Sequence, residues 1–211
     1  MIELEFKILK VLTYFDIFNY PLLEDEIYFY LGQVPQSEDF SYSLQSLLDA
    51  GIIYKFEGFF TLQNNFRLIK KRKKDNAKAE ILMPKAKRVA NFLYLFPFVR
   101  GIGISGSLSK NVASENSDFD YFIITKTNRL WIASTLLGLF KKLSFIVGKQ
   151  HWFCLNYYID ESCLEIPEKN IFTATELLTL MTPTGEETLR LFLKANNWVI
   201  EYYPNYRIKR V

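Results

Sequence analysis

The chain has 211 residues, of which 49% are apolar and 23% charged, as is typical of a folded protein with one or two domains. Its net charge of +3 is too small to indicate a general affinity for nucleic acid or membranes. One histidine and two cysteines without metal-ligand spacing argue against a zinc site or a histidine-based triad. Reduced thiols and an N-terminus unlike a signal peptide predict a cytoplasmic protein.

The first 63 residues predict three helices followed by a β-hairpin. Helical spacing of apolar residues, a proline start and glycine stops place the helices, and Glu57-Gly58 marks the turn between two apolar runs. The helices are expected over 4–18, 21–32 and 37–51, and the hairpin over 52–62. This order predicts a winged helix-turn-helix-like domain over 1–63.

The third of these helices argues against reading of DNA. It carries Glu38, Asp39 and Asp49 and no lysine or arginine, whereas helices in the major groove normally present basic or amide side chains. Docking of a protein partner is the preferred interpretation, because fold does not determine function.

A basic helical connector is expected over 64–96, with a kink or break at Pro84. Ten lysines and arginines between Arg67 and Arg88 face only Asp75 and Glu80, a local net charge of +8. Such a run fits either a solvated helix face or a surface for phosphates, RNA or an acidic partner. Its role stays open.

From residue 98 onward, strand and helix patterns alternate. Strands are expected over 98–107, 118–125 and 151–160, and helices over 128–146, with Asn128 as cap, 173–181 and 186–203. The apolar stretch 130–148 contains Lys141 and Lys142 and predicts a buried helix rather than a membrane span. The predicted fold class is α+β, with a mixed sheet flanked by helices over 97–211.

Asp118 and Asp120 carry the chemistry that the sequence indicates. Residues at i and i+2 of a strand share a face about 7 Å apart, so both carboxylates can bind one Mg²⁺ ion. Gly106 and Ser107 end the preceding strand, where a glycine lets backbone approach a phosphate and a serine can donate to it. Lys110 adds a positive charge nearby. A nucleoside triphosphate and its metal are therefore expected at one end of the sheet.

The segment resembles the nucleotidyltransferase superfamily, which includes polymerase β and the aminoglycoside nucleotidyltransferases. The family pattern is an apolar residue, Gly-Ser, about ten residues, and Asp-x-Asp in a strand. Here it reads Ile104 to Ser107, ten residues, and Asp118-Phe119-Asp120, and Ser117 completes the Ser-Asp-x-Asp form of bacterial members. The motif covers about fifteen residues and the strand–helix–strand order extends the resemblance over roughly 97–165. The resemblance implies a minimal nucleotidyltransferase fold, with Gly106, Ser107, Lys110 and Ser117 as the nucleotide-binding residues.

The resemblance also implies a third acid on the next strand, where this chain has Asn156. With strict alternation, Cys154, Asn156, Tyr158 and Asp160 share one strand face. An amide can orient an acceptor or a metal-bound water, but it cannot accept a proton as a base. Asp160 lies about 13 Å further along the strand. Asp118, Asp120 and Asn156 are the expected catalytic residues, and Asp118 and Asp120 the metal ligands.

Three functions are consistent with these features. The first is Mg²⁺-dependent transfer of a nucleoside monophosphate, with ATP as the expected donor, to a hydroxyl of a small molecule, sugar or protein. The second is a catalytically weak or inactive nucleotide-binding protein whose winged helix docks a partner. The third is a nucleic-acid-binding regulator. The acceptor and the oligomeric state, including a homo-oligomer, stay open.

Overall fold

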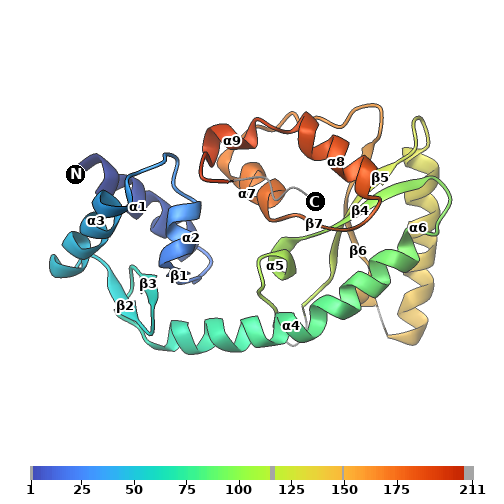
Figure 1. The fold of residues 1–211 in the computed structure, drawn as a ribbon. Coiled ribbons are helices and arrows are strands. Elements are labelled where there is room, and N and C mark those ends of the chain that lie inside the picture. The colour runs from blue at the N-terminus through green and yellow to red at the C-terminus, as the bar shows by residue number, and fades with distance from the viewer. Residues whose placement is uncertain (1, 115–116, 149, 207–211) are drawn as a thin grey trace. The chain divides into compact units, whose positions relative to one another are not determined.

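The computed structural model describes residues 2–114, 117–148 and 150–206, and within them the chain packs as two compact units (Figure 1). The first, called the N-terminal unit, consists of the residues up to Lys74 together with those from Trp198 onward. The second unit consists of Asp75 to Asn197. The α+β class is confirmed. The sequence-based domains 1–63, 64–96 and 97–211 stay a prediction about independent folding.

The N-terminal unit combines helices with a small antiparallel sheet whose strand order is β1-β3-β2. Its elements are α1 (Ile2–Asp16), β1 (Leu22–Leu23), α2 (Glu24–Phe29), α3 (Ser37–Asp49), β2 (Tyr54–Phe56), β3 (Phe59–Thr61) and the late helix α9 (Val199–Tyr202). The predicted hairpin is confirmed, because β2 and β3 pair across Glu57 and Gly58, both with positive φ. Ile8 of α1, Leu44 of α3 and Phe60 of β3 belong to one buried hydrophobic core.

The predicted helix over 21–32 is shorter than its pattern indicates. Leu22 and Leu23 pair with β3 as a strand, so that α2 begins only at Glu24. The Glu26 carboxylate accepts a hydrogen bond from the Leu23 amide and fixes this start. Pairing with the hairpin therefore overrides the helical pattern at its first positions.

The last described residues belong to the N-terminal unit. The Asn205 side chain donates to the carbonyl oxygens of Tyr28, at 2.7 Å, and Gln33, at 2.8 Å. The rings of Tyr203 and Tyr30 meet edge to face, with centroids 5.5 Å apart. The predicted helix over 186–203 is interrupted: its first part forms α8 in the second unit, and its end forms α9 in the N-terminal unit.

The basic segment forms one continuous helix, α4 (Arg67–Leu93), which passes through Pro84 without the expected break. Arg72 is buried in the N-terminal unit, where it pairs with Glu26 at 2.7 Å, donates to the Pro21 carbonyl and stacks on Tyr20. The basic run therefore includes a structural residue as well as a solvated face.

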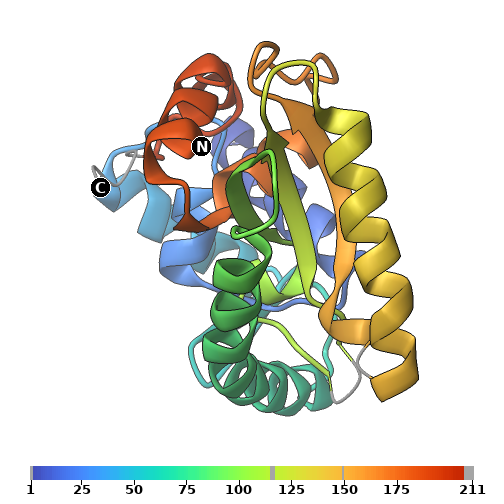
Figure 2. The ribbon, with the colours of Figure 1, turned by 90° about the vertical axis from the view of Figure 1, so that its right-hand side faces the viewer.

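The second unit is built on a four-stranded mixed sheet of order β6-β5-β4-β7 (Figure 2). Its further elements are β4 (Val99–Ser105), α5 (Gly106–Ser109), β5 (Asp120–Thr125), α6 (Leu130–Ser144), two 3-10 turns (Phe145–Val147 and Gln150–Trp152), β6 (Cys154–Asp160), α7 (Ile171–Thr179), β7 (Met181–Thr184) and α8 (Glu186–Ala195). β5 runs antiparallel to β4 and parallel to β6.

Helices cover both faces of this sheet. Ile102, Ile104 and Tyr121 face a core shared with α4 and α6, whereas Phe122 packs on Phe192 of α8 on the other face. Gly103 alternates with the isoleucines, and a Cβ on it would lie 2.7 Å from Leu180, so the glycine lets the segment after α7 approach the sheet.

Two further sequence-based details were wrong. The N-cap position of α6 is Arg129, which makes no side-chain cap hydrogen bond, rather than Asn128. Asn128 adopts a positive φ, and its backbone N–H donates to the Asp160 carboxylate. The pattern missed β7, a short edge strand that contains Pro183 and pairs with β4. Within the described residues, no helix is both long and apolar enough to cross a membrane.

Candidate functional site

Gly106 and Asp120 are brought into contact by the antiparallel pairing of β4 and β5. Ser105 is the register partner of Asp120, so the residue that follows β4 lies against the residue that begins β5. Gly106 has a φ of +69°, and a Cβ on it would lie 2.2 Å from Asp120 Oδ2. Only a glycine meets both conditions. The Gly-Ser pair and the second aspartate therefore form one structural unit.

Asp118 lies two residues before the start of β5, near enough for its charge to act on Asp120. Phe119 and Tyr121, between and after the aspartates, are buried in the α4–α6 core, as their alternation predicts. The Asp118 carboxylate is half-exposed, and its Oδ1 lies 2.7 Å from His151 Nδ1. The only histidine of the chain thus orients the first aspartate.

Asn156 is brought directly to Asp120. Its Nδ2 donates to Asp120 Oδ1 over 2.7 Å, and its Oδ1 accepts a hydrogen bond from the Cys154 thiol at 3.0 Å. The amide therefore presents a donor, not an oxygen ligand, to the carboxylate. The sequence-based role of Asn156, a catalytic residue in place of a third acid, stays a prediction.

A β-bulge at Asn156 alters the expected faces of β6. Tyr121 pairs with Leu155 and Phe122 with Tyr157, so Asn156 is the extra residue. Asn156 and Tyr157 consequently line the same cavity, while Tyr158 packs against the opposite core. The strict alternation that placed Tyr158 beside Asn156 was wrong, because a bulge reverses alternation beyond it.

The surroundings of the Asp120 carboxyl shift its pKa. Burial raises its pKa above the ordinary value, and the charges of Asp118 and Glu176 raise it further, while the neighbouring side chains of Cys154 and Asn156 lower it. Burial of the Cys154 thiol, together with its proximity to the Asp120 carboxylate, raises the thiol pKa to about 11. A cation at this place would relieve the repulsion between the carboxylates.

Lys110 follows α5 and reaches across to α7. Its Nζ forms a 2.6 Å ion pair with Glu176 and donates to the Gly106 carbonyl at 3.1 Å. Both side chains are largely buried, with 19% and 28% of their surfaces exposed. The predicted phosphate-binding lysine therefore lies beside the Gly-Ser turn, held by a carboxylate that the motif does not include.

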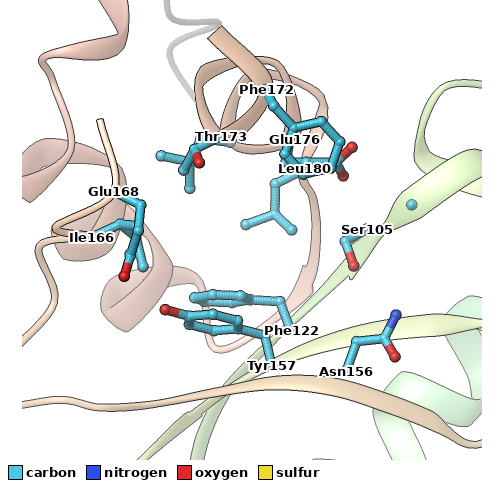
Figure 3. A pocket seen from close by; sticks show the side chains of 12 residues that line it. Ser105, Phe122, Asn156, Tyr157, Ile166, Glu168, Phe172, Thr173, Glu176 and Leu180 are labelled. Carbon is cyan, nitrogen blue, oxygen red and sulfur yellow. The ribbon is translucent and has the colours of Figure 1, made fainter. Parts of the chain in front are cut away.

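A cavity of about 460 Å³ opens beside these residues (Figure 3). Ser105 and Asn156 line one end, and Glu168 and Ile166 the other. Gly106, the neighbour of Ser105 in the chain, is also among the lining residues. Phe122 and Tyr157 are stacked at its floor, with centroids 5.4 Å apart and planes 10° from parallel. The side formed by α7 and its following turn carries these lining residues: Phe172, Thr173, Glu176, Leu177 and Leu180.

The remaining predicted site residues lie close to the motif in the chain. Ser107 is the second residue of α5. Ser117 lies in the loop before β5, where its hydroxyl accepts a hydrogen bond from the Ser114 amide at 2.6 Å. Asp160 pairs with Thr125 at the opposite end of the strands, as its distance along β6 predicted. Binding by Ser107 and Ser117 stays a prediction.

No protein-family model, curated protein or solved structure matches the chain.

Two contributors to the site were missed at the sequence level. Glu176 lies in an apolar helical pattern outside the region 97–165 that resembles the nucleotidyltransferase superfamily. A single acid inside such an apolar pattern could have marked it as a candidate site residue. The sequence assigned no role to His151, and its contact with Asp118 depends on the turn before β6. Among the described residues, no group of three or more acids, histidines or cysteines is arranged to hold a metal.

Proposed function

We propose that the protein binds a nucleoside triphosphate, ATP in the first instance, with Mg²⁺ and transfers its nucleoside monophosphate to a hydroxyl group. The observation that carries this proposal is the contact between Gly106 and Asp120. It joins a backbone turn suited to phosphate with a carboxylate suited to a hard cation. The antiparallel β4–β5 pair, with β6 parallel to β5, is consistent with the nucleotidyltransferase-type sheet that the motif implies.

Asp118 and Asp120 fit Mg²⁺ by their chemistry. Burial is the main cause of the raised pKa of Asp120, and repulsion from Asp118 and Glu176 adds to it; a bound cation would counteract these effects. Two protein carboxylates are a common complement for Mg²⁺, which takes its other ligands from phosphates and water. When bound, Mg²⁺ would neutralise charge on the phosphate oxygens.

The other residues of the site bind and orient the substrate. The backbone around Gly106 and Ser107 approaches the phosphates without a side chain in between. Lys110, next to the same turn, supplies a positive charge to them. His151 and Asn156 hold the two carboxylates in place through 2.7 Å contacts. Catalysis in this scheme is mainly positioning and charge stabilisation.

Calorimetry with Mg–ATP, followed by incubation with α-labelled ATP, tests the proposal. Wild-type protein is expected to bind Mg–ATP, and Asp120→Asn to weaken binding at least about tenfold because one anionic ligand is lost. Asp39→Asn, an exposed carboxylate change on α3, is the matched control. Absence of binding to any Mg–nucleoside triphosphate contradicts the proposal.

Binding without transfer is the second candidate, and Asn156 favours it. Its Nδ2 faces Asp120, so neither a third carboxylate nor an amide oxygen is directed there. An amide cannot take up the proton of an acceptor hydroxyl. Tight Mg–ATP binding that is lost in Asp118→Ala, without label transfer to any acceptor, distinguishes this candidate. We infer in either case that the N-terminal unit is a winged-helix-like module for a protein partner.

A further inference from the structure

The cavity beside Asp120 has a chemical character that triphosphate binding does not use. Only its Ser105–Asn156 end adjoins the proposed metal and phosphate residues. The rest is lined mostly by apolar and aromatic side chains, with Thr173, Glu168 and Glu176 as its polar members, and the cavity volume of about 460 Å³ suits a small molecule. Tyr157 and Phe172 are 44% and 54% exposed, so two aromatic rings present surface that a ligand can cover.

The charge of the lining excludes anionic ligands from this cavity. Glu168 and Glu176 are its charged residues, and no lysine or arginine is among the described side chains that line it. An anionic compound would lose hydration without gaining a positive partner there. A neutral or cationic compound with a flat apolar body meets no such cost.

Glu176 connects the cavity with the proposed phosphate site. Its carboxylate lines the cavity near the end formed by Ser105 and Asn156 (Figure 3) and is paired with Lys110 at 2.6 Å. A bound triphosphate would compete with Glu176 for the lysine, because phosphate carries more negative charge than a carboxylate. Glu176 then becomes a carboxylate without its cation, facing the cavity.

We propose that this cavity is the acceptor site, that it selects a hydroxyl carried on a planar apolar body without an anionic group, and that Glu176 receives the hydroxyl proton. The inference rests on the proposed function. In the step, the acceptor oxygen forms a bond to the α-phosphorus. The bond from that phosphorus to the oxygen leading to the β-phosphate breaks, pyrophosphate leaves with the bonding electrons, and the proton moves to Glu176 and then to solvent. The base that Asn156 cannot provide thus comes from α7.

The selectivity is tested without nucleotide by titrating three probes followed by NMR. These are para-methylbenzyl alcohol, para-(hydroxymethyl)benzoate and methyl glucoside. The alcohol is expected to bind in the millimolar range and at least about tenfold more tightly than the other two, one of which is anionic and the other polar. Tyr157→Ala should abolish this preference, whereas Tyr42→Ala, an exposed tyrosine of the N-terminal unit, should leave it intact. Equal binding of the probes, or displacement of the alcohol by α,β-methylene-ATP, overturns the acceptor site.

The role of Glu176 is tested with α-labelled ATP, Mg²⁺ and the same alcohol. Glu176→Gln should reduce label transfer at least about 100-fold, as expected for loss of a general base, while α,β-methylene-ATP still binds. Glu187→Gln, an exposed acid on α8, should transfer label as wild type does. Weakened nucleotide binding in Glu176→Gln would mean that Glu176 only positions Lys110, and this overturns its role. Absence of transfer with both ligands bound to wild type also overturns it.

The two proposals fail in different ways. If Mg–ATP does not bind, the proposed function is wrong, but the probe preference still reports on the cavity. If Mg–ATP binds and the probes are not distinguished, only the acceptor site is wrong.

Discussion

Asn156 Nδ2 donates a hydrogen bond to Asp120 Oδ1 over 2.7 Å, and the bulge at Asn156 sets this contact between β6 and β5. The amide satisfies a carboxylate whose burial and acidic neighbours raise its pKa. A second acid at the same place would instead add to the repulsion. The residue therefore stabilises the metal-free protein where a carboxylate would require a cation.

Asn156→Asp should make folding stability depend on Mg²⁺. In the metal-free protein the new carboxylate faces Asp120, and we expect a loss of about 1–3 kcal/mol in the free energy of unfolding. Millimolar Mg²⁺ should restore most of the loss and raise Tm more than it does for wild type. Thermal denaturation with and without EDTA measures both effects. An equal response of the two proteins to Mg²⁺ would contradict a metal site at Asp120.

The raised pKa of Asp120 predicts a pH dependence of stability. Between the unfolded pKa of about 4 and the higher folded pKa, the native state holds more protons, so stability falls as pH rises through this window. Asp120→Asn has no carboxyl to titrate at this position. It should therefore become the more stable of the two proteins as the pH rises above the pKa of the Asp120 carboxyl in the unfolded state. The two proteins should converge in acid. Urea denaturation across pH, in EDTA, measures the difference, and parallel curves would count against the shift.

Gly106→Ala should be destabilising and should abolish Mg–ATP binding. The positive φ of +69° and the 2.2 Å approach of a Cβ to Asp120 Oδ2 both oppose a side chain. We expect a loss of about 1–3 kcal/mol, because strain and displacement of Asp120 add. Gly138→Ala is the control: nothing lies within 4 Å of its added Cβ in α6, and alanine should stabilise that helix by about 0.5–1 kcal/mol. Chemical denaturation of both variants provides the comparison.

Arg72→Lys should destabilise the N-terminal unit although it preserves charge. The planar guanidinium of Arg72 makes three interactions at once: it pairs with Glu26, donates to the Pro21 carbonyl and stacks on Tyr20. The ammonium group of a lysine cannot make all three. We expect a loss of about 1–3 kcal/mol, because a lysine leaves either the Pro21 carbonyl or the Glu26 carboxylate without its donor. Arg88→Lys, an exposed change on the same helix, should be within about 0.5 kcal/mol of wild type. Similar losses in both would show that Arg72 is an ordinary surface cation.

The two cysteines should differ in reactivity. The pKa of the Cys154 thiol is raised to about 11, first by burial and then by Asp120, whereas Cys163 is exposed. Alkylation by iodoacetamide at mildly alkaline pH should therefore modify Cys163 at least about tenfold faster, because the thiolate is the nucleophile. Mass spectrometry of digested samples gives both rates. Asp120→Asn should accelerate Cys154 alone, and faster alkylation of Cys154 in wild type would contradict the assignment.

The core of the site could be predicted because its members are linked by local pairing. The spacing between Gly106 and Asp120 fits one antiparallel strand pair, and period-2 alternation already places Phe119 and Tyr121 in the core. The bulge at Asn156 could not be predicted, since it depends on how β6 pairs with β5. Glu176 reaches the site only through packing of α7 on the sheet, which no local pattern describes. Leu22 and Leu23 likewise become a strand only because β3 is beside them.

The return of the chain to the N-terminal unit has a consequence for biosynthesis. Asn205 and Tyr203 supply hydrogen bonds and ring contacts to residues near Tyr30, so this unit contains both early and late segments of the chain. Because translation proceeds from the N-terminus, residues 75–197 are synthesised before the segment from Trp198 onward, which completes the N-terminal unit. The unit that begins first is thus the one that is completed second, and a chain truncated after Asn197 would keep every strand of the four-stranded sheet but lack the last segment of the N-terminal unit.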